Sequence, residues 1–98
     1  MTLEEEFDAE MHRIYEEAKR RCNGYRGTRF IRMIREHGGL HTALRLLDQS
    51  GVIHDGLADL FTCGCLDLTA EHLALEPRFS ELFDDAQKAE AKRRLGRE

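Results

Sequence analysis

The chain has 98 residues, of which 41% are apolar, so it is long enough for one hydrophobic core that needs no structural metal. It contains no apolar run of bilayer-spanning length and no basic-then-apolar leader, which excludes a transmembrane helix and favours a cytoplasmic protein. Three cysteines are too few for a disulfide framework, and we therefore expect reduced thiols.

The formal net charge of −4 conceals a basic segment. Between Arg13 and Arg35 there are eight basic and two acidic residues, so this segment carries +6 and the rest of the chain −10. The basic residues are Arg13, Lys19, Arg20, Arg21, Arg26, Arg29, Arg32 and Arg35. A basic segment on an acidic protein suits phosphates or an acidic partner. The alternative is a solvated surface whose charges pair with the protein's own carboxylates.

Apolar residues three and four apart predict a long N-terminal helix. They are Leu3, Phe7, Met11, Ile14, Tyr15, Ala18 and Cys22. Thr2 and Glu5 fit a capping box, in which each side chain bonds the other's backbone N–H. Glu16–Arg20 and Glu17–Arg21 are spaced for ion pairs one turn apart, and Asn23–Gly24 is expected to end the helix.

The segment Tyr25–Gly39 predicts a short second helix with two different sides, at about 100° per residue. The apolar side is expected to hold Phe30, Met33, Ile34 and His37, and the basic side Arg29, Arg32 and Arg35. Thr28 is the expected N-cap, Tyr25 and Ile31 are expected to stay exposed, and Gly38–Gly39 is expected to end the helix.

A third helix is predicted over residues 40–49, closed by Ser50–Gly51. Its buried side is expected to be Leu40, Ala43, Leu44 and Leu47. Asp55 suits the N-cap of a fourth helix, which Gly64 is expected to end. The apolar residues of that helix are Leu57, Leu60 and Phe61.

Residues 65–68 alternate like a strand but have no second strand to pair with, so we expect an extended connector. Thr69 suits the N-cap of a fifth helix. Pro77 is expected to end that helix at the preceding residue and to begin a further short helix. Asp84 and Gln87 repeat the capping box before a last helix. We therefore predict an all-α fold: a single compact bundle of about six helices in one domain, with a long N-terminal helix followed by short ones.

Two features bear on nucleic acid. Leu46, Gly51 and Leu60 have the spacing of a helix-turn-helix unit. The would-be recognition helix carries Asp55 and Asp59 and no cation, so it is poorly suited to DNA, and a plain helical hairpin is the better account. The basic side of the second helix is the stronger candidate.

The predicted binding residues lie in and just before the second helix: Tyr25, Arg26, Arg29, Arg32 and Arg35. Arginines bind phosphates and carboxylates, and a tyrosine can stack on bases. If the arginines instead pair within the chain, Arg29 is the expected partner of Asp67 or Glu71.

The chain offers little for metal binding or catalysis. Cys63–Cys65, with Cys22, has one residue between the paired thiols where zinc sites favour two, so free thiols are expected. His37 and His41 are separated by a glycine pair, and His54–Asp55 lacks further ligands. We predict no catalytic residues, no metal and no cofactor.

An ordered set of short motifs covers nearly the whole chain. They are Tyr-x-x-Thr-Arg-Phe at 25–30, Glu-His-Gly-Gly at 36–39, Ala-x-x-Leu-Leu at 43–47, Asp-Gly-x-x-x-Leu at 55–60 and Leu-Asp-Leu-Thr-x-Glu at 66–71. The set resembles a widespread bacterial family of small all-helical proteins with no established activity. Members of that family commonly have Gly-Arg where this chain has Gly64–Cys65, which indicates that the cysteine pair is particular to this protein. The resemblance implies a helical fold and a bacterial origin.

These observations favour a non-catalytic helical module that binds a protein partner through its arginine-rich side. The alternative is a nucleic-acid-binding accessory protein in bacterial DNA processing or phage defence. No membrane partner is expected.

Overall fold

Every element in the computed structural model is helical within residues 1–23, 25–48 and 55–96, which are the residues that the structure describes. The elements are α1 (Leu3–Arg21), α2 (Thr28–His37), α3 (Gly39–Leu47), α4 (Asp55–Thr62), the 3-10 helix η1 (Leu66–Leu68), α5 (Ala70–Ala74), the 3-10 helix η2 (Pro77–Leu82) and α6 (Asp85–Leu95). The predicted all-α bundle is confirmed. The predicted turns at Gly24 and Ser50–Gly51 lie outside the described residues.

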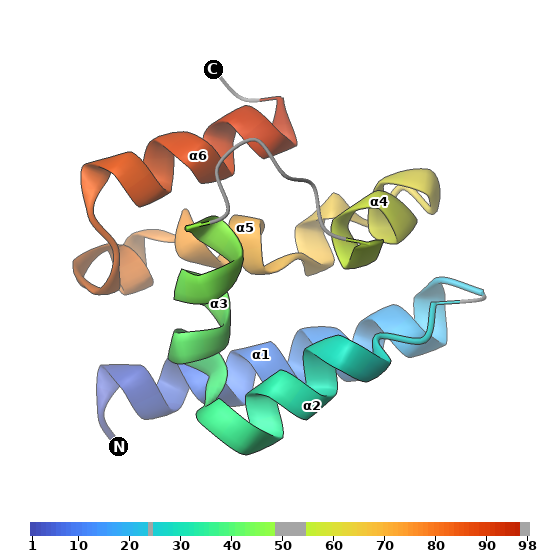
Figure 1. Cartoon of the computed structure of the whole chain (residues 1–98), viewed down its shortest axis with the longest axis horizontal. Coiled ribbons are helices and arrows are strands. Elements are labelled where there is room, and N and C mark those ends of the chain that lie inside the picture. The colour runs from blue at the N-terminus through green and yellow to red at the C-terminus, as the bar shows by residue number, and fades with distance from the viewer. Residues whose placement is uncertain (24, 49–54, 97–98) are drawn as a thin grey trace.

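The helix α3 connects two parts of the bundle (Figure 1). On one side α1 and α2 pack against each other and against α3. On the other side α3 contacts α5 and α6. The Cα radius of gyration is 12.3 Å, close to the value of about 13 Å expected for a compact chain of this length.

The stripe predicted along α1 forms one wall of the core. Its members Phe7, Met11, Ile14, Tyr15, Ala18 and Cys22 are buried, and Leu3 packs at the edge. The capping box is present, because Glu5 N donates to Thr2 Oγ1 at 3.1 Å and Thr2 N donates to Glu5 Oε1 at 2.9 Å. The predicted i,i+4 pairs are wrong: Arg20 bonds Glu17 at 2.6 Å, and Arg21 reaches Asp67 at 3.3 Å. Arg21 pairs with Asp67 because η1, which contains Asp67, packs against α1.

The glycine pair between α2 and α3 joins them without a loop. Gly38 has φ 88°, a left-handed region open to glycine, and its N–H closes α2 on Ile34 O at 2.8 Å. Gly39 is buried against α1, where a Cβ would lie 2.8 Å from Asp8 Cα. Its N–H donates to Asp8 Oδ1 at 2.6 Å. The second glycine therefore allows α1 and α3 to touch through their backbones.

Gly39→Ala is expected to lower the free energy of unfolding by about 1–3 kcal/mol, because the added methyl group forces two backbones apart. Urea unfolding followed by circular dichroism measures this loss. Gly64→Ala is the comparison, since Gly64 has φ 73° and open space around it and reports the backbone cost alone. A Gly39→Ala protein as stable as the wild type would contradict the close packing.

Thr69, Pro77 and the Asp84–Gln87 pair act as predicted, whereas Asp55, predicted to cap α4, is the first residue of that helix. Thr69 Oγ1 accepts His72 N–H at 3.0 Å, and Pro77 opens η2 as predicted. The capping box before α6 is present, with Gln87 N donating to Asp84 Oδ1 at 2.7 Å. The extended connector is wrong, because residues 66–68 coil into η1. Thr69 stabilises that turn by donating to Leu66 O at 2.7 Å.

An ion network lies in the interior between α5 and α6. The side chains of Glu71 and Arg94 are both fully buried, and Arg94 Nη1 lies 3.1 Å from Glu71 Oε2. Arg94 Nε also lies 2.7 Å from Glu90 Oε2. Hydrogen bonds from Arg93 and then Arg94 lower the pKa of Glu90 from 4.5 to about 2. The network satisfies a guanidinium that would otherwise be costly to bury.

A disulfide joins Cys22, directly after α1, to Cys63, directly after α4, with 5.6 Å between the two Cα atoms. The expectation of reduced thiols is therefore wrong for these two residues. Their separation of 41 residues is the reason, since nothing local in the sequence brings the ends of these helices together. Cys65 is the free, buried thiol. Because Cys22 and Cys63 are bonded, these cysteines no longer favour a cytoplasmic location.

Candidate partner-binding face

The predicted buried side of α2 is confirmed for Ile34 and Phe30 and is wrong for His37 and Ile31. Ile31 and Ile34 are buried, 7% and 2% exposed, while Phe30 packs at the edge of the core. His37, predicted on the apolar side, is exposed, and Ile31, predicted to be exposed, contributes to the core. Ile31 and Ile34 are three residues apart and together face the helices that α2 packs against. The buried side is therefore centred on Ile31 and Ile34.

The opposite side of α2 and the residue pair before it present four exposed arginines: Arg26, Arg29, Arg32 and Arg35. We call these four residues the arginine face. Within the described ranges no carboxylate oxygen lies within 4.0 Å of any of them. Arginines of α1, η2 and α6 do form ion pairs: Arg13, Arg20, Arg21, Arg78, Arg93 and Arg94. Arg45 on α3 is exposed and, like the arginine face, has no carboxylate oxygen within 4.0 Å among the described residues, but it stands alone on its helix. The arginine face therefore carries charge that the described part of the chain leaves uncompensated.

The expected intramolecular partners of Arg29 are taken by other residues. Asp67 pairs with Arg21 at 3.3 Å, and Glu71 pairs with Arg94 at 3.1 Å. Arg21 lies at the end of α1, beside η1, and Arg94 lies on α6, beside α5. The prediction that Arg29 binds Asp67 or Glu71 is therefore wrong.

Tyr25 is buried rather than exposed. It is 8% exposed, and its N–H donates to Cys22 O at 3.0 Å. Burial, followed by the nearby Tyr15 and Asp59, raises the pKa of Tyr25 to about 12. Gly27 allows this placement, because a Cβ there would lie 2.7 Å from the Tyr25 hydroxyl. The ring therefore belongs to the core and does not offer a surface for stacking.

Gly27, and not Thr28, is the N-cap of α2. Its φ of 58° is left-handed, and no side chain caps the helix. The first turn contains no acidic residue either. Arg29 therefore lies at a helix end whose partial positive charge adds to that of the guanidinium groups. This arrangement strengthens the attraction of the arginine face for anionic groups.

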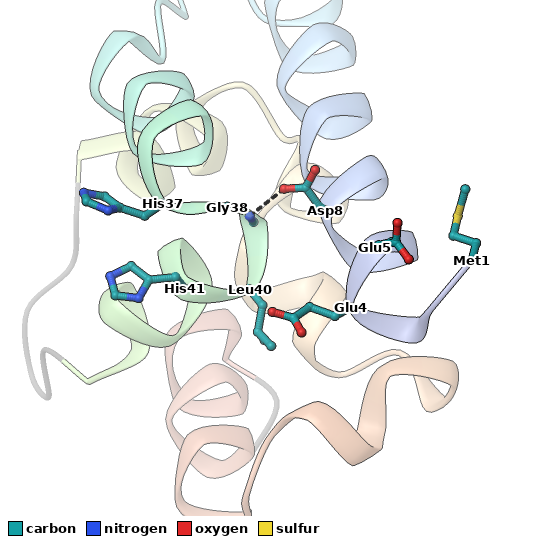
Figure 2. A pocket seen from close by; sticks show the side chains of 9 residues that line it. Met1, Glu4, Glu5, Asp8, His37, Gly38, Leu40 and His41 are labelled. Carbon is teal, nitrogen blue, oxygen red and sulfur yellow. Dashed lines mark hydrogen bonds between the residues drawn. The ribbon is translucent and has the colours of Figure 1, made fainter.

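An open hollow of about 480 Å³ lies where α2, α3 and the start of α1 meet (Figure 2). The rings of His37 and His41 stand 5.0 Å apart between centroids, on the side away from Glu5 and Met1. Glu5 is held in the capping box, and Asp8 accepts the Gly39 N–H. In the described part of the chain no three metal-binding side chains come together. Two of the carboxylates in this hollow, Glu5 and Asp8, therefore hold helix ends.

Comparison with known proteins adds no relative. No family model, no curated protein and no solved structure matches this chain. The resemblance to a bacterial family of small helical proteins therefore stays a prediction. None of the described helices combines the length and the apolar character needed to cross a bilayer.

Proposed function

We propose that the protein is a non-catalytic binding module whose arginine face docks onto an acidic surface of a partner protein. The observation that carries this proposal is the contrast among the arginines. Those of α1, η2 and α6 named above pair with carboxylates, whereas Arg26, Arg29, Arg32 and Arg35 have none within 4.0 Å among the described residues. A row of exposed guanidinium groups on one helix is a preformed site for several carboxylates.

The uneven distribution of charge along the chain would orient the module as it approaches an acidic partner. The segment Arg13–Arg35 carries +6 and the rest of the chain −10, so an acidic surface is attracted to one region and repelled by the others. Such complementarity raises the association rate and selects the docking orientation. Arg29, Arg32 and Arg35 are three residues apart, which spaces them by about 4.5 Å along the helix axis.

The burial of Tyr25 distinguishes the two candidate partners. A protein that binds single strands typically combines a basic groove with stacking aromatic rings, and Tyr25 was the aromatic ring predicted for that role. Its ring is in the core. Phe30 and Ile31, the other large apolar residues at the start of α2, also pack against or within the core. The arginine face is thus a charged surface without a stacking platform, which supports a protein partner over nucleic acid.

Reversing two charges of the arginine face, Arg29→Glu with Arg32→Glu, is expected to weaken partner binding at least about tenfold, which corresponds to about 1.4 kcal/mol. The partner is first identified by chemical cross-linking and co-purification from the native organism. Calorimetric titration of the purified partner then measures the dissociation constant at low and high salt. Affinity of the wild type is expected to fall as salt rises.

The control is Arg13→Glu with Arg20→Glu, which reverses two exposed arginines of α1 that already pair with Glu10 and Glu17. This variant is expected to bind like the wild type. Equal loss in both variants would show that total charge matters and the arginine face does not. Binding of labelled double-stranded DNA at low salt, lost only in the first variant, would replace the protein partner with nucleic acid.

A further inference from the structure

The two cysteines of the disulfide differ in their exposure to solvent. Cys22 is 2% exposed and lies in the core, whereas Cys63 is exposed at the end of α4. Thiol–disulfide exchange begins when a thiolate reaches one sulfur along the S–S axis, so access decides which sulfur is attacked. A small thiol from solvent therefore reaches Cys63, and Cys22 is the leaving group.

The third cysteine lies beside this exposed sulfur in a tight turn. Cys65 Sγ is 3.7 Å from the carbonyl oxygen of Cys63, and Gly64 between them has φ 73°. Two backbone hydrogen bonds fix the turn: Gly64 N to Phe61 O at 3.0 Å and Cys65 N to Leu60 O at 2.8 Å. Cys65 is 5% exposed, so its thiol is shielded from solvent while it stays close to Cys63.

The disulfide also determines how α4 is attached. Among the described elements, α4 packs mainly against η1, and the disulfide joins it covalently to the end of α1. A bond between Cys63 and Cys65 would lie wholly within the turn after α4 and would leave Cys22 as a thiol. Exchange between these two pairings therefore attaches α4 to α1 or releases it.

We propose that Cys22, Cys63 and Cys65 form a thiol–disulfide exchange site for small thiols, in which Cys63 is attacked and Cys65 is the resolving thiol. In the first step the thiolate RS⁻ bonds to Cys63 Sγ, the bond to Cys22 breaks, and the Cys22 thiolate takes a proton from water. In the second step the Cys65 thiol gives its proton to the hydroxide left by the first step, and the resulting thiolate bonds to Cys63 Sγ and expels RS⁻. The net change is a disulfide isomerisation, so no oxidant or reductant is consumed. This proposal stands independently of the arginine face.

The test uses the oxidised full chain and reduced glutathione as the probe thiol, at pH 8. After acid quenching and alkylation of free thiols, peptide mass spectrometry assigns every sulfur. The wild type is expected to yield the Cys63–Cys65 bond, with Cys22 alkylated. Cys65→Ser is expected to accumulate the glutathione adduct on Cys63 to a level roughly tenfold above the wild type, because the resolving thiol is missing.

Cys65→Ala provides a second variant, and circular dichroism confirms that each variant is folded before it is used. An adduct on Cys22 would overturn the assignment of the attacked sulfur. Equal adduct levels in the wild type and both Cys65 variants would overturn the resolving role. A disulfide that opens only at the rate of global unfolding, measured by hydrogen exchange, would overturn the whole site.

Discussion

Arg94→Ala is expected to lower the free energy of unfolding by about 3–5 kcal/mol, because it removes one partner of a buried ion pair and leaves the other charge in the interior. The Glu71 side chain is fully buried and would lose the guanidinium that lies 3.1 Å away. A domain of this size has a total stability of about 5–15 kcal/mol, so the variant should be only marginally folded at 25 °C. Urea unfolding followed by circular dichroism measures the difference.

The matched control is Arg93→Ala, one residue earlier on the same helix. Arg93 also pairs with Glu90, but its side chain is 44% exposed. Pairs that are open to solvent contribute about 0–1 kcal/mol, so this variant should remain close to the wild type. Equal losses in the two variants would contradict the importance of burial.

The pH at which the protein unfolds in acid is a second measure of the ion network formed by Arg94, Glu71 and Glu90. The pKa of Glu90 is lowered in the folded protein from 4.5 to about 2. A depressed carboxyl pKa contributes stability that is present above the unfolded value, near 4.5, and is lost as the pH falls through the folded value. Loss of Arg94 raises the pKa of Glu90 part of the way back, with Arg93 still in place. The Arg94→Ala protein should therefore unfold at a higher pH than the wild type.

Phe7→Ala is expected to lower the free energy of unfolding by about 3–5 kcal/mol, because it empties space at the centre of an aromatic cluster. Phe7 is fully buried and meets Phe79 edge-to-face at 5.0 Å and Phe83 at 5.4 Å between ring centroids. These contacts join α1 to η2, so the cavity would also loosen the link between the first and last parts of the chain. The melting temperature and the urea midpoint measure this loss.

Phe61→Ala makes the same chemical change at an exposed position. Phe61 is 68% exposed on α4, and truncation there is expected to change the stability by less than about 0.5 kcal/mol. If the two phenylalanine variants were equally destabilised, the core centred on Phe7 would be misplaced.

The helix starts at the two capping boxes and at Pro77 depend on neighbours in the sequence and were predicted correctly, whereas the Thr28 cap and the i,i+4 ion pairs were not. Thr2 with Glu5 and Asp84 with Gln87 form capping boxes because each pair lies within a single turn and needs no other element. Pro77 acts locally too, since its ring restricts the backbone of the residue before it. The spacing along α1 predicted both the helix and its buried side, because its apolar residues recur over five turns. All-helical architecture follows from such local signals.

Features that depend on distant segments were not predictable in the same way. The apolar residues of the short helix α2 are Phe30, Ile31, Met33 and Ile34, and the packing of α2 against α1 and α3 decides that Ile31 and Ile34 are the buried ones. Tyr25 turns inward because Gly27 leaves room for its ring. The disulfide from Cys22 to Cys63 required the ends of two helices, far apart in sequence, to coincide. The exposure of the arginine face follows from the same packing.

The glycine junction between α2 and α3 has a consequence for molecular recognition. Gly38 is the only residue between α2 and α3, and the hydrogen bond from Gly39 to Asp8 joins the start of α3 to α1. The C-terminal end of α2 is therefore fixed relative to α1 and α3 without an intervening loop. A surface carried on such a helix is already organised before any encounter. Binding through the arginine face would then cost little conformational entropy from the backbone that carries the arginines.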